Sequence, residues 1–144
     1  MEKEINVFLS QPMNGVEESE ILDNMTKVRD WISSLAPEGT TVHVIDNYHH
    51  TTLPPEHCGE RASRLWYLGQ SIQLLGDADL MPLLIPRNVD YISNGCLVEL
   101  RAAERYDIPS FYILNEIPPE EEYYTDAVKR LIDKILDNKY RPHF

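Results

Sequence analysis

The chain has 144 residues and a mass of 16.7 kDa, the size of one ordinary domain, so we expect a single domain over residues 1–144. Its 24 acidic and 13 basic residues give a formal charge of -11, which disfavours nucleic acid polymers and anionic membranes as partners because both are negatively charged. The two cysteines and an N-terminal sequence without an export signal lead us to expect a cytoplasmic protein.

The first half of the chain predicts two strands and one helix. A β-branched and aromatic run at 5–9 reads as a strand, and the turn-forming segment Ser10–Gly15 follows it. Apolar residues spaced three and four apart then predict a helix over 16–35, and a second strand is expected at 41–45. Residues 46–60 contain prolines, glycines and histidines without periodicity, so we expect a long loop there.

The second half continues the alternation. Helical spacing predicts a helix over 61–75, and the nearly unbroken apolar run at 80–85 is typical of a strand covered on both faces. A helix over 95–106, a strand at 108–114 and a helix over 120–136 complete the chain. The order βαβαβαβα predicts an α/β fold, a Rossmann-like or flavodoxin-like three-layer sandwich with a mostly parallel sheet.

In such sheets ligands bind beyond the carboxyl ends of the strands, which points to the loops that begin at Ser10, Asp46, Pro86 and Asn115. Neither a GxGxxG dinucleotide motif nor a Walker motif occurs in the chain. The sequence therefore disfavours a Rossmann oxidoreductase and a P-loop nucleotidase.

Two segments carry a family resemblance. One is VFLSQPMNG, Val7–Gly15, where a strand opens into a loop; the other is GDADLMPLLIP and the following NVDYISNGCLVELRAAERYDIPSFYI, within Gly76–Ile113. Together they resemble the nucleoside 2-deoxyribosyltransferase-like family over most of the chain. The resemblance implies an enzyme that cleaves or transfers the N-glycosidic bond of 2′-deoxynucleosides or their 5′-monophosphates, with a small-molecule nucleoside or nucleotide as its partner and without a cofactor.

The resemblance also assigns roles to individual positions. Glu99 matches the catalytic glutamate, Asp79 the aspartate at the start of a strand, and Gly95 the glycine of the turn before the catalytic helix. Asp79 is counted among the catalytic candidates, although an aspartate there also serves to fix the strand start. The glycosyl-binding loop of the family falls on five substrate-binding candidates: Ser10, Gln11, Met13, Asn14 and Gly15.

Elementary chemistry supports Glu99 as a nucleophile. It lies about one turn into the helix that starts near Asn94 and Gly95, where the helix dipole favours a carboxylate anion. Such a carboxylate attacks an anomeric carbon, and water or a second base releases the glycosyl enzyme with net retention. The alternative is that Glu99 is one of the acidic residues common in first helical turns.

The chain departs from the family at Ser71, a substrate-side position where many members have an aspartate. A hydroxyl is no general acid at neutral pH, so the proton for the leaving base has to come from Asp46, Asp90 or solvent. This departure keeps a second hypothesis open. According to this second hypothesis, the chain is a catalytically weak nucleotide-binding or sensing module with the same fold.

Ser93 occupies a position where the nucleotide-hydrolysing branch of the family uses a serine for the 5′-phosphate. With Asn94 and the backbone amides near Gly95 it forms an expected anion cradle at a helix start, although Ser and Asn are equally explained there as N-caps. Tyr91, in the loop before that helix, is the best candidate for stacking on the base.

We expect no metal site in the histidine-rich loop, because no spacing typical of zinc ligands occurs there. The residues concerned are His43, His49, His50, His57 and Cys58. The family resemblance implies a homodimer or higher homo-oligomer, since members generally complete each pocket with a neighbouring subunit. The aromatic side chains available for such a contact are those of Trp66, Tyr67, Tyr123 and Tyr124.

Overall fold

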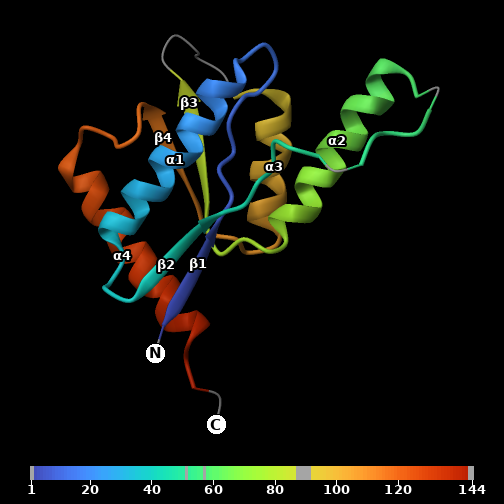
Figure 1. The fold of residues 1–144 in the computed structure, drawn as a ribbon. Coiled ribbons are helices and arrows are strands. Elements are labelled where there is room, and N and C mark those ends of the chain that lie inside the picture. Colours follow the sequence, from blue (N-terminus) through green and yellow to red (C-terminus); the bar gives the residue numbers. More distant parts are fainter. Residues whose placement is uncertain (1, 51, 57, 87–91, 143–144) are drawn as a thin grey trace.

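The computed structural model describes residues 2–50, 52–56, 58–86 and 92–142, and Figure 1 shows its fold. Four strands alternate with four helices, in the expected order. They are β1 (Lys3–Val7), α1 (Glu18–Leu35), β2 (Thr40–Val44), α2 (Glu60–Leu75), β3 (Met81–Pro86), α3 (Asn94–Arg105), β4 (Ser110–Asn115) and α4 (Glu122–Lys139). Every expected element is present, and its ends differ from the expected ones by at most three residues.

The strands form one parallel arrangement in the order β2-β1-β3-β4. β1 pairs with β2, Val7 lying opposite Val44, and β3 pairs with β4 in the same parallel sense. Beyond Val7 the chain stays extended beside β3, because the amide of Phe8 donates to Leu80 O at 2.9 Å and that of Ser10 to Pro82 O at 2.8 Å. This order is flavodoxin-like, and it confirms the α/β prediction.

Alternating side chains along β1 separate the two faces of the sheet. Ile5, Val7 and Leu9 belong to a core cluster with α1 and α4, whereas Phe8 belongs to a second cluster with α3. Because successive side chains of a strand point to opposite faces, Ser10 lies on the same face as Phe8. The hydroxyl of Ser10 is therefore directed at α3 and away from α1.

The helices differ in how much of their surface the core covers. α1 buries a stripe at three- and four-residue spacing, namely Ile21, Met25, Val28, Trp31 and Ile32. By contrast, α2 buries only Leu75 among its residues, and in Figure 1 its first turns stand away from the sheet. α3 packs over the face opposite α1 and α4, so it covers the sheet beside the carboxyl end of β1.

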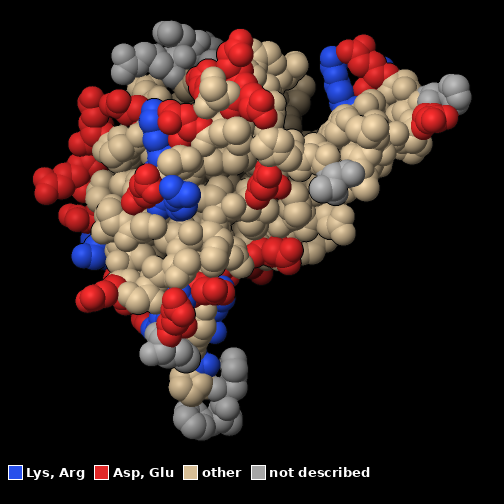
Figure 2. All heavy atoms as spheres, viewed as in Figure 1, with Lys and Arg blue, Asp and Glu red and all other residues tan. Residues whose placement is uncertain are grey.

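Negative charge dominates the surface, as the composition requires. In Figure 2 acidic side chains are more numerous than basic ones on the face shown, and they are spread over α1, α4 and the neighbouring loops. None of the described helices is both long enough and apolar enough to cross a membrane.

Candidate active site

Ser10 and Glu99 meet at the carboxyl end of β1. The buried stripe of α3 consists of Cys96, Glu99, Leu100 and Ala103, so the helical period itself places a carboxyl group against the sheet. Glu99 is 7% exposed, Ser10 is fully buried, and the Ser10 hydroxyl donates a 2.7 Å hydrogen bond to Glu99 Oε1. A buried carboxyl with a directed hydroxyl partner is thus the central feature of this edge of the sheet.

Burial changes the acidity of Glu99. Loss of solvent raises its pKa from 4.5 to about 7, and the hydrogen bond from Ser10 offsets only part of that rise. The start of a helix favours the carboxylate anion, whereas burial opposes it, and the raised pKa shows that burial has the larger effect.

Cys96 lies beside the same pair. Its thiol interacts with the hydroxyls of Ser10 and Ser93, and burial, the largest influence, raises its pKa. A thiol with a raised pKa holds its proton at neutral pH and is a poor nucleophile. The burial of Cys96 therefore disfavours its thiol as a nucleophile.

Ser93 is the N-cap of α3, and its Oγ accepts a hydrogen bond from the Cys96 amide at 3.4 Å. Asn94 and Gly95 form the first turn of the helix, where amide groups lack partners within the helix. The three residues thus stand together, one turn before Glu99. Tyr91 lies outside the described residues, so its expected stacking role has no structural account.

The loop after β1 has two kinds of residue. Gln11 is buried and structural, because its amide donates to Ile21 O at 3.2 Å and accepts from Asn24 at 3.0 Å. Met13 packs against the core cluster shared with α1. Of the five substrate-binding candidates in this loop, Ser10 is the one that hydrogen-bonds to Glu99, whereas Gln11 and Met13 anchor the loop to α1 and the core.

Asn14 and Gly15 are exposed at the tip of this loop. Gly15 has a φ of +76°, a conformation that glycine adopts without steric cost, and the amide of Val16 closes the turn on Met13 O at 3.1 Å. Glycine is therefore required here by the turn, whatever the loop binds.

Asp79 is not brought to Glu99. Its Oδ2 accepts hydrogen bonds of 2.8 Å from the Asn6 amide and from Lys139 Nζ, at the amino end of β3. Asn6 precedes Ser10 by four residues, or about 13 Å of extended strand. The structure thus favours the alternative given above, in which Asp79 fixes the strand start, over a catalytic role.

Ser71 is half-buried on α2, where the adjacent Ile72 packs against the cluster shared with α3. The aspartate that many family members have at this position is absent. No other carboxyl group is recorded as a hydrogen-bond partner of Glu99 among the described residues.

Asp46 follows β2 at the same edge of the sheet and is tied to His49. Its Oδ1 accepts from the amides of Tyr48 and His49, each at 3.0 Å, and its Oδ2 lies 3.0 Å from His49 Nδ1. Partial burial is the largest single influence and raises the pKa of Asp46, but the hydrogen bonds from His49 and Tyr48 together outweigh it and lower that pKa. A lowered pKa disfavours Asp46 as the proton donor among the three sources considered, and Asp90 lies outside the described residues.

His49 is a candidate site residue that the sequence did not identify. Besides Asp46 it contacts Glu18, with Nε2 3.1 Å from Glu18 Oε1. The hydrogen bonds to Asp46 and then to Glu18 raise the pKa of His49 above its usual 6.5. The sequence signal was an aspartate followed at three residues by histidine directly after a strand, in a loop whose histidines we considered only for metal binding.

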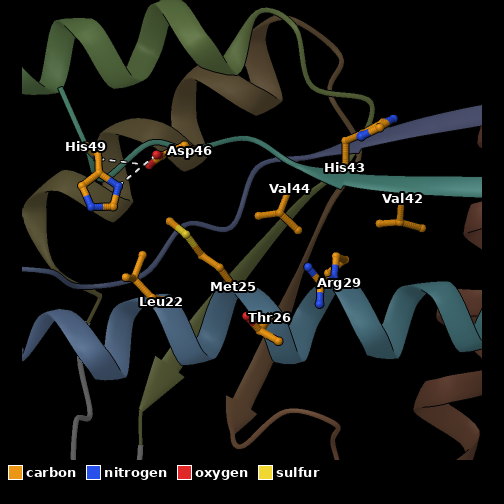
Figure 3. Close-up of a pocket in the computed structure, with 9 residues that line it drawn as sticks. All are labelled: Leu22, Met25, Thr26, Arg29, Val42, His43, Val44, Asp46 and His49. Carbon is orange, nitrogen blue, oxygen red and sulfur yellow. Dashed lines mark hydrogen bonds and ion pairs between the residues drawn. The ribbon is translucent and has the colours of Figure 1, made fainter. Parts of the chain in front are cut away.

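Two hollows open beside this pair. One, of about 470 Å³, lies between α1 and β2, and Figure 3 shows Asp46 and His49 facing each other at one end of it. The other, of about 330 Å³, lies between the loop after β2 and α2. Asp46 and His49 line both hollows, whereas Glu99 lines neither. Both of these hollows therefore lie on the β2 side of the described structure.

Asn47 connects the two halves of this edge. It is 1% exposed, and its Nδ2 donates to Leu9 O at 3.0 Å, which joins the residue after Asp46 to the residue before Ser10. Its Oδ1 is buried without a hydrogen-bond partner in the described structure. Among the described residues, no group of three or more histidine, cysteine, aspartate or glutamate side chains could hold a metal ion.

No family model matches the chain, and no curated protein matches it at a significant level. Solved structures that resemble it include a 2-deoxyribosyltransferase from the psychrotolerant bacterium Bacillus psychrosaccharolyticus. That likeness has a TM-score of 0.49 at 18% sequence identity, and it covers 96% of this chain and 93% of the other.

Proposed function

We propose that this chain cleaves or transfers the N-glycosidic bond of 2′-deoxynucleosides or their 5′-monophosphates, with Glu99 as nucleophile. The observation that carries the proposal is the buried pair at the carboxyl end of β1, where Ser10 donates a 2.7 Å hydrogen bond to Glu99. The motifs within Val7–Gly15 and Gly76–Ile113, which resemble those of the deoxyribosyltransferase-like family, name the reaction class.

The position of the pair supports a binding site. From β1 the chain passes through α1 to β2 on one side, and from β2 it passes through α2 to β3 on the other side of β1. Such a switch point in strand order is where doubly wound sheets bind ligands. Glu99 and Ser10 stand at this point, so a sugar bound there has a carboxyl group within reach.

The chemistry proceeds in two steps. The ionised carboxylate of Glu99 forms a bond to C1′ while the C1′–N bond breaks, and the departing base keeps the electron pair and takes up a proton. Water or a second base then attacks C1′ and releases Glu99, with net retention. In the first step the hydrogen bond from Ser10 holds one carboxylate oxygen and leaves the other free to attack.

A 5′-monophosphate is a suitable substrate because of Ser93. A hydroxyl has one proton to donate and two lone pairs, and the Cys96 amide uses only a lone pair of Ser93. The hydroxyl proton is not used by the cap, so it can turn from the neighbouring Cys96 thiol to a phosphate oxygen. Amides in the first turn of α3 add further donors at the positive end of the helix dipole.

A second candidate function is nucleotide binding or sensing without effective catalysis. Ser71 replaces the carboxylate expected at that position, and the raised pKa of Glu99 removes part of the ionised form at neutral pH. A protein of this kind binds a nucleotide in calorimetry yet leaves it intact during long incubation.

The experiment that separates the two is base release. The chain is incubated with a panel of 2′-deoxynucleosides and their 5′-monophosphates, with and without a second base, and free base and new nucleoside are quantified by chromatography. We expect base release by the wild type and none by Glu99→Gln. Tight binding of a panel member with no base release above the buffer control contradicts the enzyme and favours the sensor.

We also propose that the chain forms a homodimer, the simplest closed assembly. Large apolar side chains remain exposed on two helices, with Leu65 of α2 60% exposed and Tyr123 of α4 72% exposed. α2 buries little within its own chain, so it has surface available for a second copy.

A further inference from the structure

The proposed reaction needs a proton for the departing base, and Glu99 cannot supply it while acting as nucleophile. Asp46 is ionised at neutral pH because its pKa is lowered: burial alone raises that pKa, but the hydrogen bonds from His49 and Tyr48 outweigh it. A proton donor is therefore better provided by the proton-bearing side chain that hydrogen-bonds to Asp46. That group is His49.

Asp46 fixes the imidazole in one orientation. Its Oδ1 accepts hydrogen bonds from the backbone amides of Tyr48 and His49, and its Oδ2 lies 3.0 Å from His49 Nδ1. A carboxylate only accepts hydrogen bonds, so Nδ1 carries a proton toward Asp46 and Nε2 points the other way. An aspartate that orients a histidine through Nδ1 is a recurrent arrangement in proton-transfer sites.

The outward nitrogen has an exchangeable partner. His49 Nε2 lies 3.1 Å from Glu18 Oε1, and the side chains of both residues are more than half exposed. Exposed pairs of this kind contribute little stability, so a bound base can displace Glu18 at low cost. Until then Glu18 keeps Nε2 protonated, because both nitrogens face carboxylates.

His49 follows β2, a neighbour of β1, and therefore lies at the same edge of the sheet as Ser10. Asp46 follows β2 and Ser10 follows β1, and the 3.0 Å bond from Asn47 to Leu9 O holds these strand ends together. His49 lines the hollow of about 330 Å³ whose opposite wall includes Gln70 and Gln73 of α2. A base seated in that hollow has amide groups on one side and an imidazolium on the other.

We infer that His49 is the general acid of the proposed reaction and that Asp46 is its positioning residue. As the C1′–N bond breaks, its electron pair stays on the base and the proton on His49 Nε2 passes to a ring nitrogen. Glu99 meanwhile forms the ester to C1′. In the second step the neutral imidazole accepts a proton from the attacking water or base, which restores both groups. This inference rests on the proposed function.

The charged groups around His49 favour this assignment. Asp46 and Glu18 face the ring with carboxylates, and their hydrogen bonds raise its pKa, Asp46 having the larger effect. Arg29 and His43 line the far part of the same 470 Å³ hollow, and His50 lines the other hollow. Among the described residues, the hydrogen-bond partners of the ring are the two carboxylates, and the ring of Tyr48 packs edge-on against it at 5.0 Å.

A pair of substrates tests the inference. The base of 2′-deoxyinosine needs a proton to leave, whereas that of 7-methyl-2′-deoxyguanosine already carries a positive charge and leaves without one. We expect His49→Gln to lower kcat/KM at least 100-fold on 2′-deoxyinosine, because general acids contribute about 10² to 10⁴. On 7-methyl-2′-deoxyguanosine the loss should be below about 5-fold, a gap that no purely structural role produces.

His43→Gln is the matched control, since it removes an exposed histidine on β2 that pairs with Glu4. It should leave both rates unchanged. Asp46→Asn should shift the alkaline limb of the kcat/KM profile of 2′-deoxyinosine to lower pH, because it removes the largest cause of the raised pKa of His49.

The outcomes are distinct. If a folded His49→Gln variant loses kcat/KM equally on both substrates, or on neither, the role of His49 is overturned. The proposed role of Glu99 is not affected by that result. A wild-type chain that releases base from neither substrate overturns the proposed function and this inference with it. A loss of kcat/KM in His49→Gln that is confined to 2′-deoxyinosine supports the inference, if the alkaline limb of the pH profile also shifts to lower pH in Asp46→Asn.

Discussion

The hydroxyl of Ser10 donates a 2.7 Å hydrogen bond to the carboxyl of Glu99, although 89 positions separate the two residues in sequence. The contact joins the end of β1 to the first turns of α3, and both side chains are buried. A carboxyl group in such a place is costly to ionise, and a neutral hydroxyl compensates only partly. The acidity of this one group therefore links the stability of the fold to the proposed chemistry.

Replacing Glu99 by glutamine should abolish base release. The amide is nearly isosteric and still accepts from Ser10, but it cannot form a glycosyl ester, so we expect a loss of several orders of magnitude in kcat with ligand binding retained. Single-turnover assays and calorimetry measure the two quantities. Glu104→Gln, on the exposed face of the same helix, is the control and should leave turnover unchanged. Wild-type turnover in Glu99→Gln would exclude Glu99 as nucleophile.

Stability should depend on pH through Glu99. Its pKa is raised from 4.5 to about 7, so between these values the folded chain holds a proton that the unfolded chain has released. The free energy of unfolding therefore falls as pH rises through this window, by on the order of 3 kcal/mol.

Urea unfolding at pH 5 and pH 8 checks this for the wild type and for Glu99→Gln. The glutamine cannot ionise, so the variant should lack this contribution, and the difference between the two proteins should be larger at pH 8. Other titrating groups, His49 among them, are common to both proteins and cancel. Parallel pH dependence in the two proteins would show that Glu99 titrates near its usual value.

Ser10→Ala should move the activity profile toward higher pH. The hydroxyl lowers the pKa of Glu99 against the effect of burial, so its removal raises that pKa further and delays ionisation of the nucleophile. The acid limb of kcat/KM, which we expect near 7 in the wild type, should shift upward, while activity at high pH is largely recovered. Ser33→Ala, an exposed serine on α1, is the control. An unmoved limb with uniformly reduced activity would mean that Ser10 only fills space.

The fold was predictable because each element has a strong local pattern. The stripe of Ile21, Met25 and Val28 fixes α1, and the apolar run of β3 marks a strand covered on both faces. The sequence identified Glu99 and Ser10 as separate candidates, whereas their positions on the buried stripe of α3 and on the face of Phe8 come from the structure. The hydrogen bond between Ser10 and Glu99 could be found only from the three-dimensional structure.

Other features depend on contacts that leave no local pattern. Asp79 and Lys139 pair across 60 positions, which placed Asp79 in a structural role. The Asp46–His49 pair lies in a loop without periodicity, and the pKa of His49 depends in part on Glu18 of α1. Gln11 resembled a ligand-side polar residue in the sequence, but its partners on α1 are visible only in the structure.

Sedimentation should find a homodimer, twice the 16.7 kDa of one chain, at micromolar concentration. The exposed Leu65 on α2 favours burial against a second copy, so Leu65→Glu should shift the equilibrium toward the monomer. Lys27→Glu, at an exposed position on α1, is a charge-changing control and should leave the monomer–dimer equilibrium unchanged. A wild-type chain that sediments only as a monomer contradicts the proposed assembly.

A 5′-monophosphate should bind better than the matching nucleoside, and Ser93 is the residue to test. Its cap uses a lone pair and not the hydroxyl proton, and hydrogen bonds to a charged phosphate are worth roughly 1.5 to 3 kcal/mol each. Ser93→Ala should therefore weaken monophosphate binding by about ten-fold or more and leave nucleoside binding nearly unchanged. Calorimetry with matched deoxynucleoside and deoxynucleotide pairs measures both affinities.

Ser93→Asp separates capping from phosphate binding. Aspartate is as good an N-cap as serine, so α3 should remain intact, but its charge repels the phosphate. We therefore expect Ser93→Asp to weaken monophosphate binding more than Ser93→Ala, although it preserves the cap better. If capping were the sole role of Ser93, the order of the two variants would be reversed. Equal wild-type affinities for the two ligands would instead identify the nucleoside as the substrate.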